Sequence, residues 1–448
     1  MCRGDHGEGL MPHFLNTLDA DFEQAFERLL RAKRADAPDV RQAVSAILAD
    51  VQDRGDAALS DLTAKFDQLD LTSDRFAFSE AEITAAEAAI SQEERKALEL
   101  AATRIRAYHE RQLPEDAQWT DDIGATLGWR WTPVSSAGLY VPGGLASYPS
   151  SVLMNAIPAS VAGVKRLVMT VPSPRGVVNP LVLFAAKLAG VETVYRLGGA
   201  QAVGALAYGT ETIEPVDKIT GPGNAYVAEA KRQVFGQVGI DMIAGPSEIL
   251  VIADKNNDPN WIALDLLSQA EHDESAQAIL ITTDATFADL VNEAIEAHLE
   301  ILERRTIAEA SWRKNGAIIL VQNMGEAAAL ADDIAPEHLE ICVDNPSVVA
   351  NNISHAGAIF LGAWTPEAIG DYIGGPNHVL PTAGSARFSS GLSVLDFMKR
   401  TTLAQMTPAA LGAIGPAAAE LARSERLEAH GLSVVSRLEQ LNKKGDFR

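Results

Sequence analysis

The spacing of apolar residues divides the chain into a helical N-terminal third and an alternating remainder. In the first part, apolar residues recur every three or four positions with charged residues between them, which is the pattern of amphipathic helices. This pattern predicts helices over residues 22–35, 40–55, 56–66 and 79–108. His109 follows the last of these helices beside Arg111 and Gln112, and we expect it on a solvated surface.

Short β-rich runs begin near Trp129 and alternate with further helical patterns. The runs predict strands over residues 167–171, 193–197, 249–253, 278–282, 318–321, 339–343 and 358–361. Apolar strands that alternate with helices are typical of parallel sheets covered on both faces. After about residue 392 the pattern is helical again.

These patterns predict an α/β fold with two Rossmann-like parallel-sheet domains and helical N-terminal and C-terminal extensions. A chain of 448 residues is too long for one ordinary core. We assign residues 138–246 to one Rossmann-like domain. We assign residues 36–137 together with 247–391 to the main α/β domain, residues 1–35 to an N-terminal extension, and residues 392–448 to a helical tail.

Charge and cysteine content exclude several classes of protein. The net charge of −23 argues against a nucleic-acid partner, which would need a basic face. The two cysteines, Cys2 and Cys342, are too few for a disulfide scaffold or a thiolate-rich zinc site, so nitrogen and oxygen atoms must hold any metal. No apolar run is long enough to span a bilayer, and the first ten residues lack the features of a signal peptide. We therefore expect a cytoplasmic protein without a membrane partner.

Four glycine-containing turns are candidates for ligand binding, and they lie at residues 141–144, 197–201, 220–224 and 244–248. Gly198 and Gly199 separate a predicted strand from a predicted helix, where free backbone N–H groups can face an anion such as a pyrophosphate. The turn at 220–224 is not the standard dinucleotide fingerprint, because Tyr226 stands where a third glycine belongs. Ordinary strand-to-helix turns are the alternative reading.

Two short motifs carry groups that can bind a metal or move a proton. Gln269 and His272 are three residues apart at the end of a predicted helix, so they share a face and could chelate a divalent metal. Glu337 and His338 precede a strand, where an acid beside an imidazole suits proton transfer. Helix capping and an edge ion pair are the respective alternatives.

Three further residues have weaker local signals. Asp371 lies in a glycine-rich stretch and is a possible carboxylate ligand. Glu425 and His430 lie in the C-terminal helical region and, by local sequence alone, are ordinary surface residues.

Taken together, the motifs resemble those of the histidinol dehydrogenase family over residues 14–441. The motifs occur in the family's order: GLYVPGG at 138–144, LGGAQA at 197–202, TGPGN at 220–224, AGPSE at 244–248, LSQAEH at 267–272, APEHL at 335–339 and NHVLPT at 377–382. Residues 1–10 have no match, and the residues after His430 are not the family's commonest continuation.

The resemblance implies the oxidation of L-histidinol to L-histidine by two NAD⁺ through histidinaldehyde, the last step of histidine biosynthesis. It implies one zinc ion per subunit, and the implied ligands are Gln269, His272, Asp371 and His430. It also implies a homodimer in which the C-terminal tails are exchanged, so that Glu425 and His430 reach the partner's site.

The resemblance assigns the remaining roles as well. Glu337 would activate water for attack on the aldehyde, and His338 would transfer protons at the alcohol and hydrate oxygens. The implied NAD contacts are Tyr140, Gln201 and Asn224. The implied substrate contacts are Ser247, Gln269, His272, His338, Asp371, Glu425 and His430.

Elementary chemistry agrees with this division of roles. Hydride leaves readily only when a base takes the alcohol proton, and histidine titrates near neutral pH. An imidazole and an amine are good zinc donors, which explains a zinc site without cysteine. A cysteine thiohemiacetal is hard to build, because Cys342 falls inside a predicted strand; we expect neither cysteine to be catalytic.

Three other functions remain open at this stage. A member of the same family could oxidise another polar alcohol, such as a sulfonated diol, with the same zinc and NAD. A zinc hydrolase could use Glu337 as a general base on metal-bound water and would not bind NAD. A catalytically silent binding protein would lack a ligand, whereas all four proposed ligands are present.

Overall fold

The computed structural model describes residues 12–35, 40–143, 148–243 and 245–444. The N-terminal extension at 1–10 and two residues of the glycine turns, Gly144 and Ala244, lie outside the described residues. The chain divides into two compact units, Met1–Gln112 with Ser135–Phe397, and Leu113–Val134 with Met398–Arg448. Among the described helices, none is long and apolar enough to cross a membrane. The cytoplasmic location stays a prediction.

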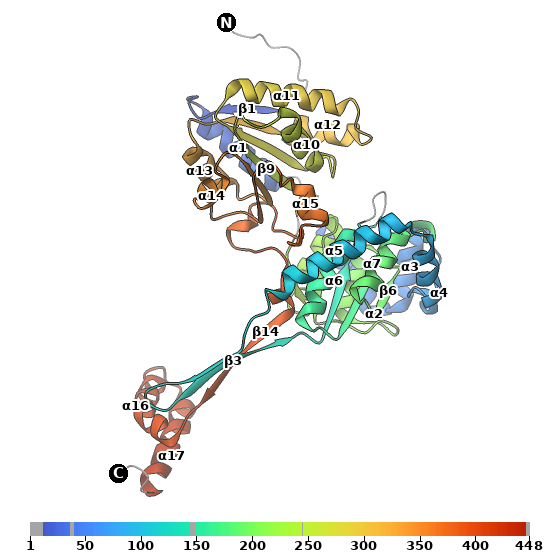
Figure 1. Cartoon of the computed structure of the whole chain (residues 1–448). Coiled ribbons are helices and arrows are strands. Elements are labelled where there is room, and N and C mark those ends of the chain that lie inside the picture. The colour runs from blue at the N-terminus through green and yellow to red at the C-terminus, as the bar shows by residue number, and fades with distance from the viewer. Residues whose placement is uncertain (1–11, 36–39, 144–147, 244, 445–448) are drawn as a thin grey trace. The chain divides into compact units, whose positions relative to one another are not determined.

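A six-stranded parallel sheet forms one half of the first unit (Figure 1). Its strands are ordered β1 (His13–Asn16), β11 (Ala317–Leu320), β10 (Gln277–Thr282), β9 (Glu248–Ala253), β12 (His338–Cys342) and β13 (Ala358–Leu361). Ile249 and Val251 face one side of β9, and Leu250 and Ile252 face the other, in two separate cores. Helices cover both sides, which is why the central strands are mostly apolar.

The helices over the two faces of this sheet come from different parts of the chain. The first core includes residues from α10 (Pro259–Ala270), α11 (Ala285–Leu299) and α12 (Arg305–Asn315). The second includes residues from α1 (Phe22–Ala35), α13 (Met324–Ile334) and α14 (Pro346–Ala350). A short helix, α15 (Glu367–Tyr372), follows β13 and contacts α10.

A five-stranded parallel sheet forms the other half of the first unit. Its strands are ordered β6 (Thr193–Tyr195), β5 (Arg166–Thr170), β4 (Ser136–Tyr140), β7 (Lys218–Thr220) and β8 (Gly239–Ile240). The chain runs outward from β4 through α6 (Pro149–Ala162) and α7 (Pro180–Ala189), and then back through α8 (Gly199–Tyr208) and α9 (Ala225–Val234). The right-handed crossovers place the two helix pairs on opposite faces. The two parallel sheets confirm the predicted fold class.

The packing of the N-terminal helices differs from the predicted grouping of residues 36–137 with 247–391. The helices α2 (Arg41–Arg54) and α3 (Asp56–Asp67) share a core with α8 and α9 of the five-stranded sheet. The helices α4 (Glu80–Ala89) and α5 (Gln92–Glu110) contact α7 and α6. Periodicity shows that a helix has an apolar face but not which sheet covers that face.

The helix predicted over 79–108 is interrupted. Ile90 is extended, and Ser91 begins α5 with a capping box in which its hydroxyl accepts from the Glu94 N–H and the Glu94 carboxylate accepts from the Ser91 N–H. An identical arrangement of Ser79 and Glu82 begins α4. The Ser-x-x-Glu signature for a second helix start was present in the sequence.

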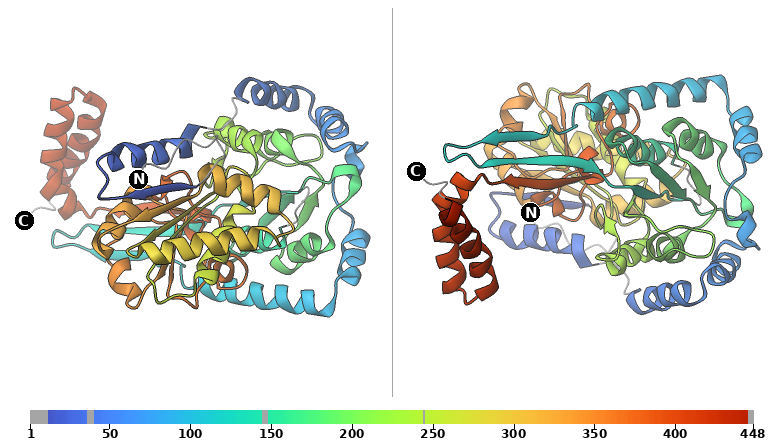
Figure 2. Two further views of the ribbon diagram at one scale, coloured as in Figure 1. Left: turned by 90° about the horizontal axis from the view of Figure 1, so that it is seen from above. Right: turned by 90° about the horizontal axis from the view of Figure 1, so that it is seen from below.

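The second unit contains a three-stranded antiparallel sheet and a pair of packed helices. The strands are ordered β14 (Met398–Gln405), β3 (Thr126–Pro133) and β2 (Ala117–Thr120). The helices α16 (Pro408–Ser424) and α17 (Glu428–Lys444), red in Figure 2, pack against each other. The prediction that everything after residue 392 is helical is therefore wrong for β14, whose mostly exposed side chains give no apolar alternation.

Candidate active site

A pocket of about 350 Å³ lies within the first unit and is lined by segments at the strand ends of both parallel sheets. The loop after β7 and the segments before β9 and β12 contribute to its lining, together with the end of α10 and part of α15. Seven residues predicted from the sequence line it: Asn224, Ser247, Gln269, His272, Glu337, His338 and Asp371. The fold therefore brings together residues that are up to 147 positions apart, from 224 to 371.

The end of α10 places Gln269 and His272 at this pocket. The helix ends at Ala270, and the His272 N–H donates to the Gln269 carbonyl oxygen at 3.1 Å. The Gln269 side chain is 1% exposed, and neither atom of its amide head group has a hydrogen-bond partner among the described residues. A buried amide without partners is costly, so its oxygen is suited to a ligand such as a metal ion.

Backbone geometry places Glu337 and His338 at the amino end of β12. Ala335 adopts a left-handed conformation at φ 46° after α13, and Pro336 then directs the chain into the strand. The Glu337 carboxylate accepts from the Glu248 N–H at 2.9 Å. The His338 Nδ1 atom lies 3.0 Å from the Glu248 carbonyl oxygen, which can only accept. His338 therefore carries a proton on Nδ1, and Nε2 is the ring atom that can exchange a proton with a substrate.

Three carboxylates surround the His338 ring. Its Nδ1 lies 3.3 Å from a Glu367 oxygen and 3.8 Å from a Glu337 oxygen, and its Nε2 lies 3.6 Å from an Asp371 oxygen. Burial lowers the pKa of His338, but the negative charges of Glu367, Glu337 and Asp371 together raise it well above its usual value. Burial also raises the pKa of Glu337 to about 8 and that of Glu367 to about 7.

The same groups fit a divalent cation. Donor atoms of His338, Glu367 and Asp371 all lie within 4.8 Å of one another. One Asp371 oxygen is buried without a hydrogen-bond partner among the described residues, as is the Gln269 amide. The available donors are nitrogen and oxygen atoms, which suit zinc as well as harder cations. A cation would also offset the charge that these carboxylates concentrate in a buried place.

Glu248, Glu367 and His378 belong to this site, although sequence reasoning gave them no role. Glu248 is 2% exposed and contacts both Glu337 and His338. His378 lines the pocket, with Nδ1 2.8 Å from the Asp371 carbonyl oxygen and Nε2 3.2 Å from the Ser151 hydroxyl. Glu367 stands four residues before Asp371 on α15, a spacing that places both on one helix face and could have identified it.

The prediction that His109 lies on a solvated surface is wrong. Its side chain is fully buried, with Nδ1 2.8 Å from the Ile105 carbonyl oxygen and Nε2 3.3 Å from the Asn377 amide nitrogen. The Asn377 amide also donates to the Met154 carbonyl oxygen at 2.6 Å. His109 thus supports the segment that carries His378 into the pocket.

The three predicted cofactor residues are placed differently from one another. Asn224 lines the pocket, and its side-chain oxygen caps α9 by accepting from the N–H groups of Tyr226 and Val227. Tyr140 is 3% exposed, and its hydroxyl accepts from the Gly199 N–H at 3.0 Å. Gln201, 1% exposed, lies in the first turn of α8. Tyr140 thus supports the Gly198–Gly199 turn, and neither Tyr140 nor Gln201 is among the residues that line the pocket.

Two predicted site residues belong to the second unit. Glu425 forms the C-terminal cap of α16, and His430 lies in the first turn of α17. Both are exposed in this unit. Their predicted roles as substrate and zinc contacts stay predictions.

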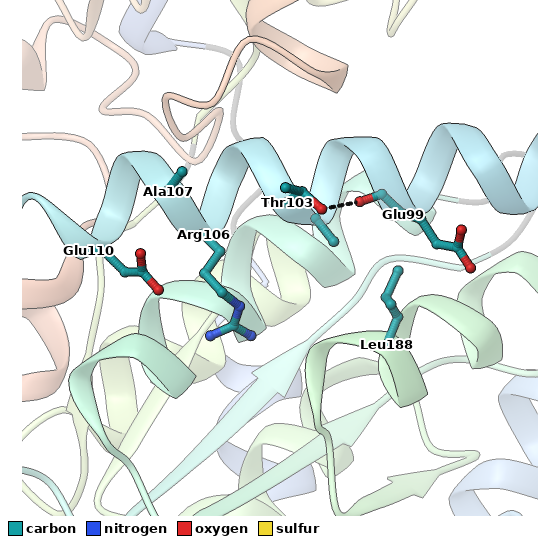
Figure 3. A pocket seen from close by; sticks show the side chains of 7 residues that line it. Glu99, Thr103, Arg106, Ala107, Glu110 and Leu188 are labelled. Atoms are coloured by element: carbon teal, nitrogen blue, oxygen red, sulfur yellow. Dashed lines mark hydrogen bonds between the residues drawn. The ribbon is translucent and has the colours of Figure 1, made fainter.

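Cys342 and a second cavity offer no alternative chemistry. Cys342 ends β12 in the core, and burial raises the pKa of its thiol to about 12, so the nucleophilic thiolate is scarce at neutral pH. A depression of about 520 Å³ over α5, shown in Figure 3, is lined by Arg106, two glutamates and small or apolar residues. It contains no predicted site residue.

Comparisons with known proteins agree with the motifs. The family profile described as histidinol dehydrogenase matches residues 30–438. The histidinol dehydrogenase of Cereibacter sphaeroides is 71% identical over 96% of this chain and 100% of its own length, and that of Ruegeria pomeroyi is 69% identical over the same shares. The crystal structure of histidinol dehydrogenase from Elizabethkingia anophelis superimposes with a TM-score of 0.91 at 37% identity, covering 96% of this chain and 99% of that one. The chain belongs to the histidinol dehydrogenase family.

Proposed function

We propose that this protein oxidises L-histidinol to L-histidine with two NAD⁺, by way of histidinaldehyde, as the last step of histidine biosynthesis. The observation that carries the proposal is the orientation of His338 beside Glu337. The Glu248 carbonyl oxygen accepts the Nδ1 proton of His338, and the Glu248 N–H donates to the Glu337 carboxylate. A base for the alcohol and a carboxylate that can activate water therefore meet at one pocket. The family's activity as an oxidoreductase requires such a pair.

In the first oxidation, the neutral form of His338 takes the hydroxyl proton of the alcohol at Nε2 while hydride passes to NAD⁺. The products are the aldehyde, NADH and one proton. In the second oxidation, Glu337 takes a proton from water as the water adds to the aldehyde. His338 then takes the remaining hydroxyl proton as a second hydride passes to the second NAD⁺, and the carboxylate of the product forms. The buried setting of both residues excludes bulk water from these transfers.

The residues that would hold zinc are Gln269, His272 and Asp371 of one subunit and His430 of its partner. A zinc ion held by these residues, one per subunit, would supply a Lewis acid for the imidazole and amino nitrogens of the substrate. The partnerless amide of Gln269 and the partnerless Asp371 oxygen support this assignment. Ser247 and the partner's Glu425 would complete the substrate contacts, together with His338.

NAD would bind at the loops that follow the strands of the five-stranded sheet. The proposed contacts are Tyr140, Gln201 and Asn224. The N-terminus of α9 supports this location, because helix N-terminal N–H groups attract phosphate oxygens. Tyr140 would act by holding the Gly198–Gly199 turn rather than by presenting its hydroxyl, which already accepts from Gly199.

Exposed apolar surface on each unit supports the proposed homodimer with exchanged tails. On the first unit, Trp364 is 83% exposed, and its ring centroid lies 5.2 Å from that of the half-exposed Trp261, with the two ring planes tilted by 58°. The edge strand β13 also exposes Ile359 and Leu361. On the second unit, Leu421 and Leu432 are 65% and 58% exposed. Large apolar side chains exposed on both units are suited to such an interface, and light scattering of the purified protein should give twice the chain mass.

The decisive experiment counts the NADH formed per L-histidinol by zinc-loaded protein and identifies the product. Two NADH and L-histidine are the expected result. NADH from another polar alcohol, such as a sulfonated diol, but none from histidinol would assign a sister activity. Zinc binding without NADH from any alcohol would favour a hydrolase or a silent protein.

A further inference from the structure

A fully buried ion pair lies directly behind the loop that follows β7. Lys231 of α9 and Asp241, which follows β8, have side chains that are 2% and 1% exposed and contact each other. Neither residue has a role in the chemistry derived above. Both belong to the lining of the pocket, next to the loop of residues 221–224.

The two charged side chains bind the backbone N–H and the backbone carbonyl oxygen of one residue in that loop, Gly221. The Lys231 ammonium donates to the Gly221 carbonyl oxygen at 2.9 Å, and the Gly221 N–H donates to the Asp241 carboxylate at 2.8 Å. Gly221 has φ 111°, and a Cβ atom there would overlap the carbonyl oxygen of Tyr140. The turn therefore approaches β4 so closely that only glycine fits at position 221. The hydrogen bonds from Lys231 and to Asp241 then restrict the orientation of the Gly221 backbone.

The geometry of α9 explains why the Lys231 side chain reaches the loop. Asn224 caps the start of α9, and Lys231 is seven residues further along, on the same face of the helix. Long side chains on a helix point back toward its N-terminus, which brings the Lys231 ammonium under the loop. The loop is thus closed by Gly221 at one end and by Asn224 at the other.

A buried ion pair of this kind is a poor stabiliser, because the cost of removing two charges from water offsets their attraction. Its value lies in orientation, since each charge requires a defined backbone partner. We propose that Lys231 and Asp241 are positioning residues that clamp Gly221 and so hold the 221–224 loop in the shape that accepts NAD. This inference rests on the proposed function, which places NAD at that loop.

The test removes both charges at once, because a single neutralisation would leave an uncompensated buried charge. In the Lys231→Met/Asp241→Asn variant, the asparagine keeps an acceptor for the Gly221 N–H, while the Gly221 carbonyl oxygen loses its ammonium donor. We expect the dissociation constant and KM for NAD to rise about tenfold, as for the loss of one charge-assisted hydrogen bond. The KM for L-histidinol, the zinc content and kcat should stay within about twofold of the wild type.

A matched control removes another ion pair from the same helix. The Arg232–Glu229 pair of α9 lies three residues apart, with Arg232 59% exposed, and it makes no bond to the loop. The Arg232→Gln/Glu229→Gln variant should bind NAD within about twofold of the wild type. If the clamp variant does not fold, Lys231→Arg keeps the charge balance but replaces the compact ammonium by a wider head group, and NAD affinity should fall several-fold.

The outcomes separate the clamp from the proposed function. A folded clamp variant with wild-type affinity for NAD overturns the clamp, and so does a variant that loses NAD and histidinol affinity in equal proportion. A Lys231→Arg variant with unchanged NAD affinity also overturns it. A wild-type protein that forms no NADH rejects the proposed function itself.

Discussion

Replacement of Glu337 by glutamine tests the proposed division between the two oxidations. The amide oxygen of glutamine can still accept from the Glu248 N–H, which lies 2.9 Å from the carboxylate in the native protein. The change should therefore cost less than about 1 kcal/mol of stability. The amide cannot take a proton from water. General base catalysis contributes about 10²–10⁴-fold, or roughly 2.7–5.4 kcal/mol, so the aldehyde step should slow by that factor while alcohol oxidation changes little.

The pH dependence of the aldehyde step is a second, independent test of the role of Glu337. Burial raises the pKa of Glu337 to about 8, so only about a tenth of it is the active carboxylate at pH 7. The wild-type aldehyde step should accelerate as pH rises through about 8, and the variant should lack this rise. The ratio of wild-type to variant rates should then grow about tenfold between roughly pH 7 and pH 9.

The raised pKa of Glu337 also predicts that the stability of the folded protein falls with rising pH, whereas the rate of the aldehyde step increases. The folded-state pKa of Glu337 lies above its unfolded value, so folding favours the protonated acid and loses stability as pH rises toward and through about 8. The glutamine variant has no proton to lose, and at high pH it should be at least as stable as the wild type in thermal melting.

The assay is a single-turnover measurement of NADH, started separately from L-histidinol and from L-histidinaldehyde on zinc-loaded protein. Glu337→Asp is the matched variant, since it keeps a carboxylate but shortens the side chain. Equal slowing of both oxidations by Glu337→Gln would refute the assigned role, and so would an aldehyde step whose dependence on pH is unchanged.

Three further replacements test other parts of the site and fold. His272→Ala should lower the zinc content measured by atomic absorption, and a fully loaded variant would contradict its role as a ligand. Cys342→Ser should keep kcat within about twofold, since the buried thiol has a pKa of about 12, and loss of turnover in a folded variant would restore a cysteine mechanism. Glu82→Gln should cost about 1 kcal/mol at neutral pH in urea denaturation. The hydrogen bond from Arg196 lowers the pKa of Glu82 to about 2, so the cost should vanish as pH falls from its ordinary pKa toward 2; a constant cost would contradict the ion pair.

The fold could be predicted because its strands are buried on both faces. Such strands contain continuous apolar runs, as β9 does from residue 249 to 253, and the helices between them carry a clear period. β14 could not be predicted in this way, because it pairs with β3 from a distant part of the chain and exposes most of its side chains. Its register is set by antiparallel pairing and by contacts such as Arg400 against Trp129 and Trp131, which no local pattern contains.

The candidate site could be predicted only where its chemistry was concentrated in short motifs. Glu337 and His338 are adjacent, and Gln269 and His272 are one helical turn apart. Glu248 was inside a recognised motif but had no visible role, because its contribution is a buried contact to a segment about 90 residues away. Sequence patterns identify groups that act on a ligand more readily than groups that orient other groups.

The proposed substrate contacts and the proposed NAD contact lie on segments that belong to different sheets. The amino ends of β9 and β12 and the end of α10 carry Glu337, His338 and Gln269, whereas the loop after β7 carries the proposed NAD contact Asn224. The proposed four-electron oxidation would consume two NAD⁺ for one substrate, so the cofactor would be exchanged while the aldehyde stays bound. Because the proposed substrate contacts and the proposed cofactor loop belong to separate sheets, one could release its ligand without the other. The Lys231–Asp241 pair lies beside the loop after β7, where NAD⁺ would be exchanged. Its loss should therefore weaken NAD binding and leave substrate binding unchanged.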